Sequence, residues 1–336
     1  MKKYQNNFKT EIYSFFRLST LLKIKKILKI SGIKFVIYQI LYFFLSLVVK
    51  SKSYFLKGIF FDALKNQSEL LITKNRYNEK FILFSSDSII SKEMYVKEEF
   101  DLKKLEKTLN FLKIKKNKNI ENLYDIGANI GVICIPAVNR GLVKRAYAVE
   151  PESQNFQLLK TNIVLNNLEE KISSYNYALS DKDDEIVDME LAKNSSGDHR
   201  IRKFTKFNIH GEEKREIVKV KTKKFDSLFN NLNQKNDLVW IDTQGYEPII
   251  LSGSKKLIDN KVPIVIEFWP YGLKRSDLWE KMFETLNNFN YFIDLSSESF
   301  AENKINDSSL NNLKNGWDQE KKGSPSLFTD LLLLRE

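Results

Sequence analysis

The sequence contains little cysteine, histidine, glycine or proline: one, two, 12 and 6 residues among 336. The single thiol, Cys134, cannot form an internal disulfide, which favours a reducing compartment such as the cytosol. Its neighbours are apolar, so we interpret it as a core residue rather than a nucleophile. One cysteine and two histidines argue against a zinc site of the usual ligand types. The scarcity of glycine and proline excludes a collagen-like chain and a flexible linker.

The chain has no lysine cluster interleaved with aromatic residues, although its formal net charge is +11. The excess lysine is spread among asparagine and isoleucine, so we predict no nucleic-acid partner. Hydrophobic residues make up 42% of the chain and charged residues 29%, so nothing indicates bulk disorder. A length of 336 residues suffices for one large domain and an extension.

The N-terminal quarter contains an apolar run, but the run is short. It covers residues 35–49, is broken by Gln39 and Ser46, and falls below the roughly 20 residues of a transmembrane helix. The preceding segment, 21–30, alternates basic and apolar residues at roughly helical spacing. A long basic lead and the lack of a small-residue cleavage site argue against a signal peptide. We predict a helical N-terminal extension over residues 1–80 and a main domain over 81–336.

This extension has two main interpretations, beside a third in which it spans the membrane once. In the first, the extension packs on the main domain of a cytoplasmic protein. In the second, a basic amphipathic helix and the apolar run make a peripheral contact with an anionic membrane surface. Residues 20–50 would make that contact, and the protein would then lie at the inner face of the membrane.

From about residue 80 the sequence alternates short β-rich runs with helical patterns. This alternation indicates an α/β fold with a mostly parallel sheet flanked by helices. The expected strands are 123–125, 145–150, 172–179, 238–242, 262–268, 291–295 and 327–334. About 60 residues separate the third strand from the fourth, too many for a plain crossover. Residues 185–191 and 217–220 alternate like strands, so we expect an inserted β-hairpin that serves as a substrate lid.

A glycine loop follows the first of these strands: Asp125-x-Gly127-x-Asn129-x-Gly131. In an open parallel sheet, ligands bind beyond the carboxyl ends of the strands. Gly127 allows a tight turn near a ligand, and Gly131 allows the next helix to pack close to the strand. Asp125 is placed to accept a hydrogen bond from an amino group, and Glu150, at the next strand end, to accept both ribose hydroxyls. The four-residue glycine spacing suits a ligand with a cationic tail better than a dinucleotide pyrophosphate.

Four motifs from about Phe81 to Phe268 resemble the FkbM family of methyltransferases. They are Asp125-Ile-Gly-Ala-Asn-Ile-Gly131, Ala148-Val-Glu-Pro151, Ala178-Leu-Ser-Asp181 and Asp242-x-x-Gly-x-Glu247. The resemblance implies a class I methyltransferase fold, Rossmann-like and seven-stranded, with a helical N-terminal extension and a β-hairpin insert added here. It also implies S-adenosylmethionine as cofactor and, most often in the family, a sugar or polyketide hydroxyl as methyl acceptor.

The resemblance also assigns the cofactor contacts. Asp125, Gly127 and Gly131 would line the methionine end of the cofactor, and Glu150 would bind the ribose. The adenine would lie near Asn176 and Ala178, and we add Asn129 and Asp242 to the predicted contacts.

One motif departs from the family pattern. The family commonly shows Lys-Ile-Asp-x-Glu-Gly-x-Glu, where this chain has Trp240-Ile-Asp-Thr-Gln244-Gly-Tyr-Glu247. Any proton transfer that rests on the family's lysine and first glutamate is therefore in question here.

Transfer of a methyl group to an alcohol requires loss of the hydroxyl proton, and a nearby base assists it. We predict His199 as that base, because an imidazole titrates near ~6.5, with Asp198 and Arg200 placing its loop over the cleft. Asp242 is its rival. Glu247 and Glu267 are predicted to contact the acceptor, as are Asp198 and Arg200. Two carboxylates could instead hold a divalent cation, but their spacing fixes no ligand geometry, and we predict no metal.

The sequence therefore predicts an S-adenosylmethionine-dependent methyltransferase. Its acceptor would be a hydroxyl of a glycan or of a related cell-envelope or secondary-metabolite compound. The alternative is a non-catalytic S-adenosylmethionine-binding module of the same fold. A dehydrogenase-like nucleotide binder is disfavoured, because the third glycine of its fingerprint is missing. The oligomeric state stays open.

Overall fold

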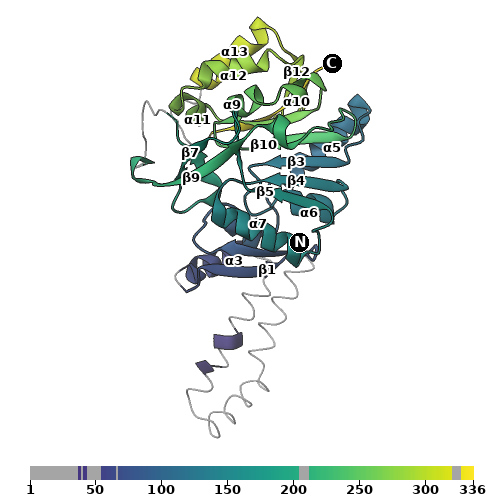
Figure 1. Ribbon diagram of the computed structural model, residues 1–336. Coiled ribbons are helices and arrows are strands. Elements are labelled where there is room, and N and C mark those ends of the chain that lie inside the picture. The colour runs from purple at the N-terminus through teal and green to yellow at the C-terminus, as the bar shows by residue number, and fades with distance from the viewer. Residues whose placement is uncertain (1–36, 39–40, 44–53, 66, 204–211, 320–326) are drawn as a thin grey trace, which may run out of the picture. The chain divides into compact units, whose positions relative to one another are not determined.

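The computed structural model describes residues 37–38, 41–43, 54–65, 67–203, 212–319 and 327–336 (Figure 1). The chain divides into two compact units, Met1–Ala63 and Leu64–Glu336. The second unit starts ahead of the expected boundary at Phe81, because it includes a hairpin of β1 (Leu70–Lys74) and β2 (Lys80–Phe84). The side-chain oxygens of Asn162 and Asn166, in the helix α7 (Ser153–Leu165) and at its end, accept backbone N–H groups of β2.

Of the first unit, the structure describes short helical pieces at 37–38 and 41–43 and most of α3 (Tyr54–Leu64). Large apolar side chains are exposed on these pieces: Ile37, Tyr38, Leu41, Tyr42, Tyr54, Phe55 and Ile59. The predicted amphipathic segment 21–30 and most of the apolar run 35–49 lie outside the described residues. Within the part of the chain that is described, no helix is long and apolar enough to cross a membrane.

The second unit contains a mixed sheet of eight strands in the order β13-β12-β14-β11-β10-β3-β4-β5. Their bounds are β3 (Asn122–Ile126), β4 (Arg145–Val149), β5 (Ile172–Tyr175), β10 (Asp237–Ile241), β11 (Ile264–Phe268), β12 (Tyr291–Asp294), β13 (Asn303–Lys304) and β14 (Thr329–Leu334). Five neighbouring strands are parallel to one another: β5, β4, β3, β10 and β11. Strand β14 is antiparallel to both of its neighbours, β11 and β12. The expected count was seven. The additional strand, β13, has two residues, too few to show a strand pattern in the sequence.

The strand order reverses between β3 and β10: from β3 the chain moves outward to β4 and β5, and from β10 it moves to β11 on the other side. Such a switch point leaves a crevice at the carboxyl ends of the two strands, where open α/β sheets bind ligands.

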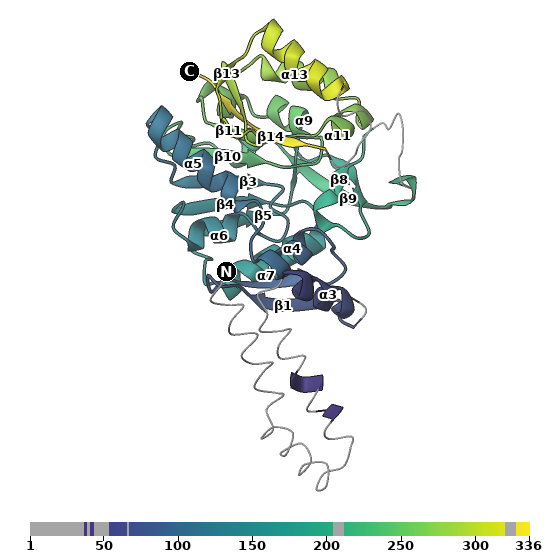
Figure 2. The ribbon, with the colours of Figure 1, turned by 180° about the vertical axis from the view of Figure 1, so that it is seen from behind.

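Helices cover both faces of this sheet (Figures 1 and 2). One hydrophobic core joins the sheet to α4 (Ile90–Lys97), α5 (Leu102–Lys116), α6 (Cys134–Asn139) and α7. The other core joins it to α8 (Phe225–Leu228), α9 (Glu247–Ser252), α10 (Lys255–Asp259), α11 (Pro270–Arg275), α12 (Trp279–Leu286) and α13 (Asp307–Gln319). Because side chains alternate along a strand, Leu238 and Trp240 of β10 enter the first core, and Val239 and Ile241 the second.

The insert between β5 and β10 forms a second sheet in the order β6-β9-β7-β8. Its strands are β6 (Ala178–Leu179), β7 (Ile186–Leu191), β8 (Arg200–Ile201) and β9 (Glu216–Lys223), with 3₁₀ turns η1 (Ser196–Asp198) and η2 (Glu212–Lys214). The antiparallel pairing of β7 with β9 confirms the expected hairpin. The expected strand 172–179 was wrong in its extent. It ends at Tyr175, because the Asn176 amide donates to the carbonyls of Glu150 and Pro151, and β6 joins β9 instead.

Candidate active site

A cavity of about 1170 Å³ opens at the carboxyl ends of the central strands. The loops after β3, β4 and β10 line it, and so do the end of β11 and the insert from Met189 to Ile201. Of the predicted site residues, those lining the cavity are Gly127, Asn129, Glu150, Ala178, Asp198, His199, Arg200, Asp242 and Glu267. The remaining four, Asp125, Gly131, Asn176 and Glu247, do not line it.

The two glycines of the first loop are required by contacts within the protein. Both have positive φ, +87° at Gly127 and +91° at Gly131, where other residues are strained. A Cβ on Gly127 would overlap the carbonyl oxygen of Asp242, and one on Gly131 would lie 2.6 Å from Cδ1 of Ile135. Gly127 thus allows the loops after β3 and β10 to touch, and Gly131 allows the loop to pack on α6.

Asp125, which is buried, and Asn176, which is exposed, hold the loops through hydrogen bonds to the backbone. The Asp125 carboxylate accepts the backbone N–H of Cys134 at 3.2 Å, and burial raises its pKa to about 6. Asn176 donates to the carbonyls of Glu150 and Pro151 at 2.9 and 3.0 Å. Both side chains therefore bond to the protein itself, and their direct contact with a cofactor stays a prediction.

Glu150 presents a buried carboxylate to the cavity, with 4% of the residue exposed. One oxygen accepts the N–H of Asn129 and the other the N–H of Glu152, each at 2.9 Å. Burial raises its pKa to about 8. Since a carboxylate oxygen has two lone pairs, each oxygen can accept a further hydrogen bond from a ligand.

The tip of the insert is tied to this loop by polar contacts that the sequence analysis missed. The carbonyl of Ser196 accepts the side-chain amides of Asn129 and Asn155 at 2.9 and 3.2 Å. Its hydroxyl donates to the buried carboxylate of Asp87 at 2.7 Å. These residues come from segments far apart in the sequence and share no spacing pattern, so no sequence signal identifies them.

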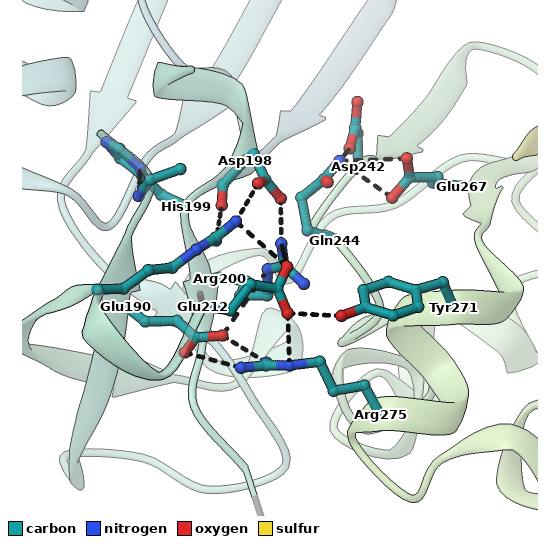
Figure 3. Close-up of polar contacts among 12 residues, drawn as sticks. Glu190, Asp198, His199, Arg200, Glu212, Asp242, Gln244, Glu267, Tyr271 and Arg275 are labelled. Atoms are coloured by element: carbon teal, nitrogen blue, oxygen red, sulfur yellow. Dashed lines mark hydrogen bonds and ion pairs between the residues drawn. The ribbon is translucent and has the colours of Figure 1, made fainter. Parts of the chain in front are cut away.

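Asp242 and Glu267 meet at the ends of the adjacent strands β10 and β11, with Gln244 between them (Figure 3). The Gln244 amide nitrogen donates to Asp242 Oδ1 at 2.9 Å and lies 3.1 Å from both Glu267 carboxylate oxygens. Burial, together with neighbouring acidic groups, raises the pKa of both carboxyls, that of Glu267 well above its usual range.

Glu247 stabilises the loop that carries Gln244. Its Oε1 accepts the N–H and hydroxyl of Thr243, both at 2.9 Å, and the N–H of Gly245 at 3.3 Å. The residue is fully buried and does not line the cavity, so its predicted acceptor contact stays a prediction. Trp240 lies in the core on the α4–α7 face, whereas Gln244 lines the cavity. Of the two departures from the family motif, only that at Gln244 reaches the site.

The geometry of His199 argues against its predicted role as the base. Its Nδ1 accepts the backbone N–H of Ala192 at 3.0 Å, and burial lowers its pKa. The neutral ring must then carry its proton on Nε2, which leaves neither nitrogen free to take another. Figure 3 shows His199 on the far side of Asp198 and Arg200 from Asp242 and Glu267. Asp242 is the better candidate.

Asp198 and Arg200 belong to an ion-pair cluster that joins the insert to α11 (Figure 3). Asp198 pairs with Arg200 at 2.5 Å and with Arg215, while Arg200 also pairs with Glu212 at 3.0 Å. Arg275 of α11 pairs with Glu190 and, at 3.0 Å, with Glu212. Arg200 is 2% exposed, so its charge is compensated inside the protein.

Within the described ranges, no group of three or more His, Cys, Asp or Glu side chains is arranged to hold a metal ion.

The sequence profile of the FkbM methyltransferase domain matches residues 125–293, half of the chain and most of the sheet just described. The chain belongs to the FkbM family of methyltransferases. This membership makes S-adenosylmethionine its cofactor. The motifs that indicated the family in the sequence lie at the cavity, so family and fold agree. No curated protein matches the chain.

Several solved structures are distantly similar to the chain, and three of them are compared with it. A methyltransferase FkbM from Methylobacillus flagellatus KT is 14% identical with a TM-score of 0.37, covering 64% of this chain and 43% of its own. TYW2 of P. horikoshii in complex with MeSAdo is 14% identical with a TM-score of 0.34, covering 80% and 72%. TYW2 of M. jannaschii in complex with AdoMet is 15% identical with a TM-score of 0.36, covering 80% and 88%. This chain thus spans less than half of the M. flagellatus protein. These similarities are too distant for residue-by-residue comparison.

Proposed function

We propose that this methyltransferase transfers a methyl group to a hydroxyl of a glycan or of a related cell-envelope or secondary-metabolite acceptor, with Asp242 as the base. The observation that carries the proposal is the pair of carboxyls at the ends of β10 and β11, half-buried Asp242 and buried Glu267, which lines the same cavity as Gly127 and Glu150. A base for the acceptor and the contacts for the methyl donor therefore lie in one compartment.

The residues at the glycine loop fit S-adenosylmethionine. Glu150 has lone pairs free for two ribose hydroxyls, and Asn155 Oδ1 is buried with no hydrogen-bond partner among the described residues. Hydroxyl and ammonium groups supply the donors that such acceptors need. We infer that Gly127, Asn129 and Glu150 would hold the methionine and ribose parts, and Ala178 the adenine.

The charges of the cavity favour a neutral acceptor rich in hydroxyls. Among the described residues that line it are nine Asp or Glu side chains and four Lys or Arg side chains. Arg200 and Arg215 already pair with Asp198 and Glu212, so they add no free positive charge for an anionic substrate. Carboxylates accept hydrogen bonds from sugar hydroxyls, and Trp269 adds an aromatic surface in the lining.

When bound, S-adenosylmethionine supplies a methyl group on a positively charged sulfur. Asp242 would take the proton as the acceptor O–H bond breaks. The electron pair freed on oxygen would bond to the methyl carbon while the methyl–sulfur bond breaks, with its electrons left on a neutral sulfur. The raised pKa of Asp242 makes it a stronger base than an exposed carboxylate. The close contact between the loops after β3 and β10, which Gly127 permits, sets the distance between the donor side and the base side.

The test is transfer of a labelled methyl group from S-adenosylmethionine to fractionated glycans, lipids and small molecules. The proposal predicts label in a hydroxyl-bearing fraction, in a linkage that survives mild alkali as an ether does. Label in RNA, or in an alkali-labile ester, would contradict it.

The non-catalytic alternative predicts a different outcome. A binding module would bind S-adenosylmethionine in calorimetry and would transfer no label to any fraction. The pair argues for the enzyme, because carboxyls with strongly raised pKa values that line a cavity are typical of active sites.

A further inference from the structure

We propose that Gln244 is a positioning residue whose amide takes the place of a cation between Asp242 and Glu267. It holds the two carboxyls as a pair that shares one proton, with Glu267 protonated and Asp242 ionised and ready to act. The catalytic part of this inference rests on the proposed function, whereas the pairing does not.

The contacts fix both the place and the orientation of the amide. The nitrogen lies 2.9 Å from Asp242 Oδ1 and 3.1 Å from each Glu267 oxygen, so it faces three carboxylate oxygens at once. A nitrogen with two hydrogens can donate to both carboxyls. The flipped amide would direct its carbonyl oxygen at the ionised Asp242 carboxylate, which has no hydrogen to donate to it.

The backbone holds Gln244 in this position. Gln244 has a φ of +59° and is followed by Gly245 with a φ of +93°. A Cβ on Gly245 would lie 2.8 Å from the carbonyl carbon of Gly272 in α11, so the loop is fitted closely against that helix. Glu247 adds hydrogen bonds to the backbone N–H groups on either side of Gln244.

Negatively charged groups surround the pair and raise the pKa of both carboxyls. Glu247, Asp330 and Asp101 act on Asp242, and Asp198 joins Glu247 and Asp330 in acting on Glu267. The nearby cations are engaged elsewhere. Lys104 pairs with Asp330 at 2.6 Å and Asp101 at 3.3 Å.

No lysine or arginine of the described segments forms an ion pair with Asp242 or Glu267; Arg200 and Arg215 pair with Asp198 instead. Two carboxyls that face one amide nitrogen at 2.9–3.1 Å and have no cation do not both ionise near neutral pH, so they share a proton. The Gln244 amide makes its shorter hydrogen bond, 2.9 Å, to Asp242 and lies 3.1 Å from Glu267, which favours the ionised form on Asp242 and the proton on Glu267; the larger rise of the Glu267 pKa agrees.

The departure from the family motif then acquires a physical meaning. A glutamate at position 244 would place three carboxylates together, an oxygen set that suits a divalent cation. Gln244 brings donor hydrogens to that place instead. Glutamine in place of the family's glutamate thus changes how the negative charge of Asp242 and Glu267 is compensated, while both carboxyls are retained.

The first experiment needs neither cofactor nor acceptor. The free energy of unfolding is measured from pH 5 to pH 8 for wild type, Gln244→Leu and Gln154→Leu. Gln154 is a matched control, since it is an exposed glutamine that lines the same cavity and makes no contact with the pair.

A carboxyl whose pKa is raised on folding binds more protons in the folded state, so stability falls as pH rises from about 4 through the raised pKa. The donors of Gln244 favour the ionised form, so removing them raises the pKa of the pair further. Gln244→Leu should therefore lose more stability than wild type between pH 5 and pH 8. A tenfold higher affinity of the pair for the shared proton corresponds to an additional loss of about 1.4 kcal/mol in the free energy of unfolding.

Gln154→Leu should keep the wild-type dependence of stability on pH. The proposal would be overturned if Gln244→Leu were destabilised relative to wild type by the same free energy at pH 5 and at pH 8. It would also be overturned if Gln154→Leu changed the pH dependence of stability as much as Gln244→Leu does.

A second variant, Gln244→Glu, keeps the shape of the side chain and protects the test against misfolding of the leucine variant. Added Mg²⁺ should raise the melting temperature of Gln244→Glu and leave that of wild type unchanged. An equal effect of Mg²⁺ on the two proteins would show that the amide does not occupy the place of a cation.

Activity provides the last readout. The acid limb of the pH–rate profile of Gln244→Leu should move to higher pH, by about one unit for the same tenfold change in proton affinity. A purely structural role would lower the rate at every pH without moving the limb. If the stability results hold but no protein, wild type included, transfers a methyl group, the proposed function fails and the pairing stands.

Discussion

Neutral variants of Asp242 and Glu267 separate the roles of the two carboxyls. Asp242→Asn and Glu267→Gln each remove one ionisable group and keep the size of the side chain. A general base contributes ~10²–10⁴-fold, so Asp242→Asn should lose at least ~10²-fold in rate, about 2.7 kcal/mol of activation free energy. Glu267 already carries a proton, and glutamine resembles it in charge. Glu267→Gln should therefore stay within about tenfold of wild type, the cost of a slightly altered hydrogen bond.

The assay is turnover at saturating S-adenosylmethionine from pH 5 to pH 9, with cofactor affinity measured separately by calorimetry. The base must be ionised, and burial raises the pKa of Asp242. The rate of wild type should therefore rise with pH, with a midpoint above the ~3.9 of an ordinary aspartate, and Glu267→Gln should keep this limb. An active Asp242→Asn beside an inactive Glu267→Gln would reverse the assignment. Near-normal turnover of both variants would refute a carboxylate base altogether.

Three further predictions concern the rest of the chain. Glu150→Ala should weaken S-adenosylmethionine binding by about 1–3 kcal/mol, because it removes two hydrogen bonds of roughly 0.5–1.5 kcal/mol each, and unchanged calorimetric affinity would contradict the ribose assignment. His199→Ala should keep turnover within about tenfold of wild type, since its Nδ1 is engaged by a backbone N–H, and a ~10²-fold loss with intact cofactor binding would restore it as the base. The peripheral membrane contact of the N-terminal extension stays a prediction. The full chain should co-sediment with vesicles containing phosphatidylserine, less so in high salt or with Phe55→Ser and Ile59→Ser, and equal sedimentation of the variants would favour packing on the main domain.

The cofactor side of the cavity was predictable because its signals are local. Glycine spacing and an acidic residue at the next strand end identify the loop from two short stretches. The physical reasons for these residue types were only partly predictable from the sequence. Gly127 avoids a backbone atom of Asp242, and Asp125 holds the N–H of Cys134. Both partners lie outside the pattern that pointed to these residues.

The acceptor side was less predictable because its contacts join distant segments. Glu190 and Arg275 are 85 residues apart, and Ser196 and Asp87 are 109 apart. The choice of His199 rested on the ordinary pKa of imidazole. What changes that choice is one hydrogen bond from the backbone of Ala192, which depends on how the insert turns between β7 and β8.

The central proposal is that the methyl group is transferred to an acceptor oxygen in this cavity. Carbon-13 NMR of the product, made with S-adenosylmethionine labelled in its methyl carbon, reports the atom that receives the group. The account predicts a single methyl ether on a hydroxyl-rich acceptor, formed by wild type and absent with Asp242→Asn. A methyl group on nitrogen, sulfur or carbon, or a methyl ether formed equally well by Asp242→Asn, would contradict it.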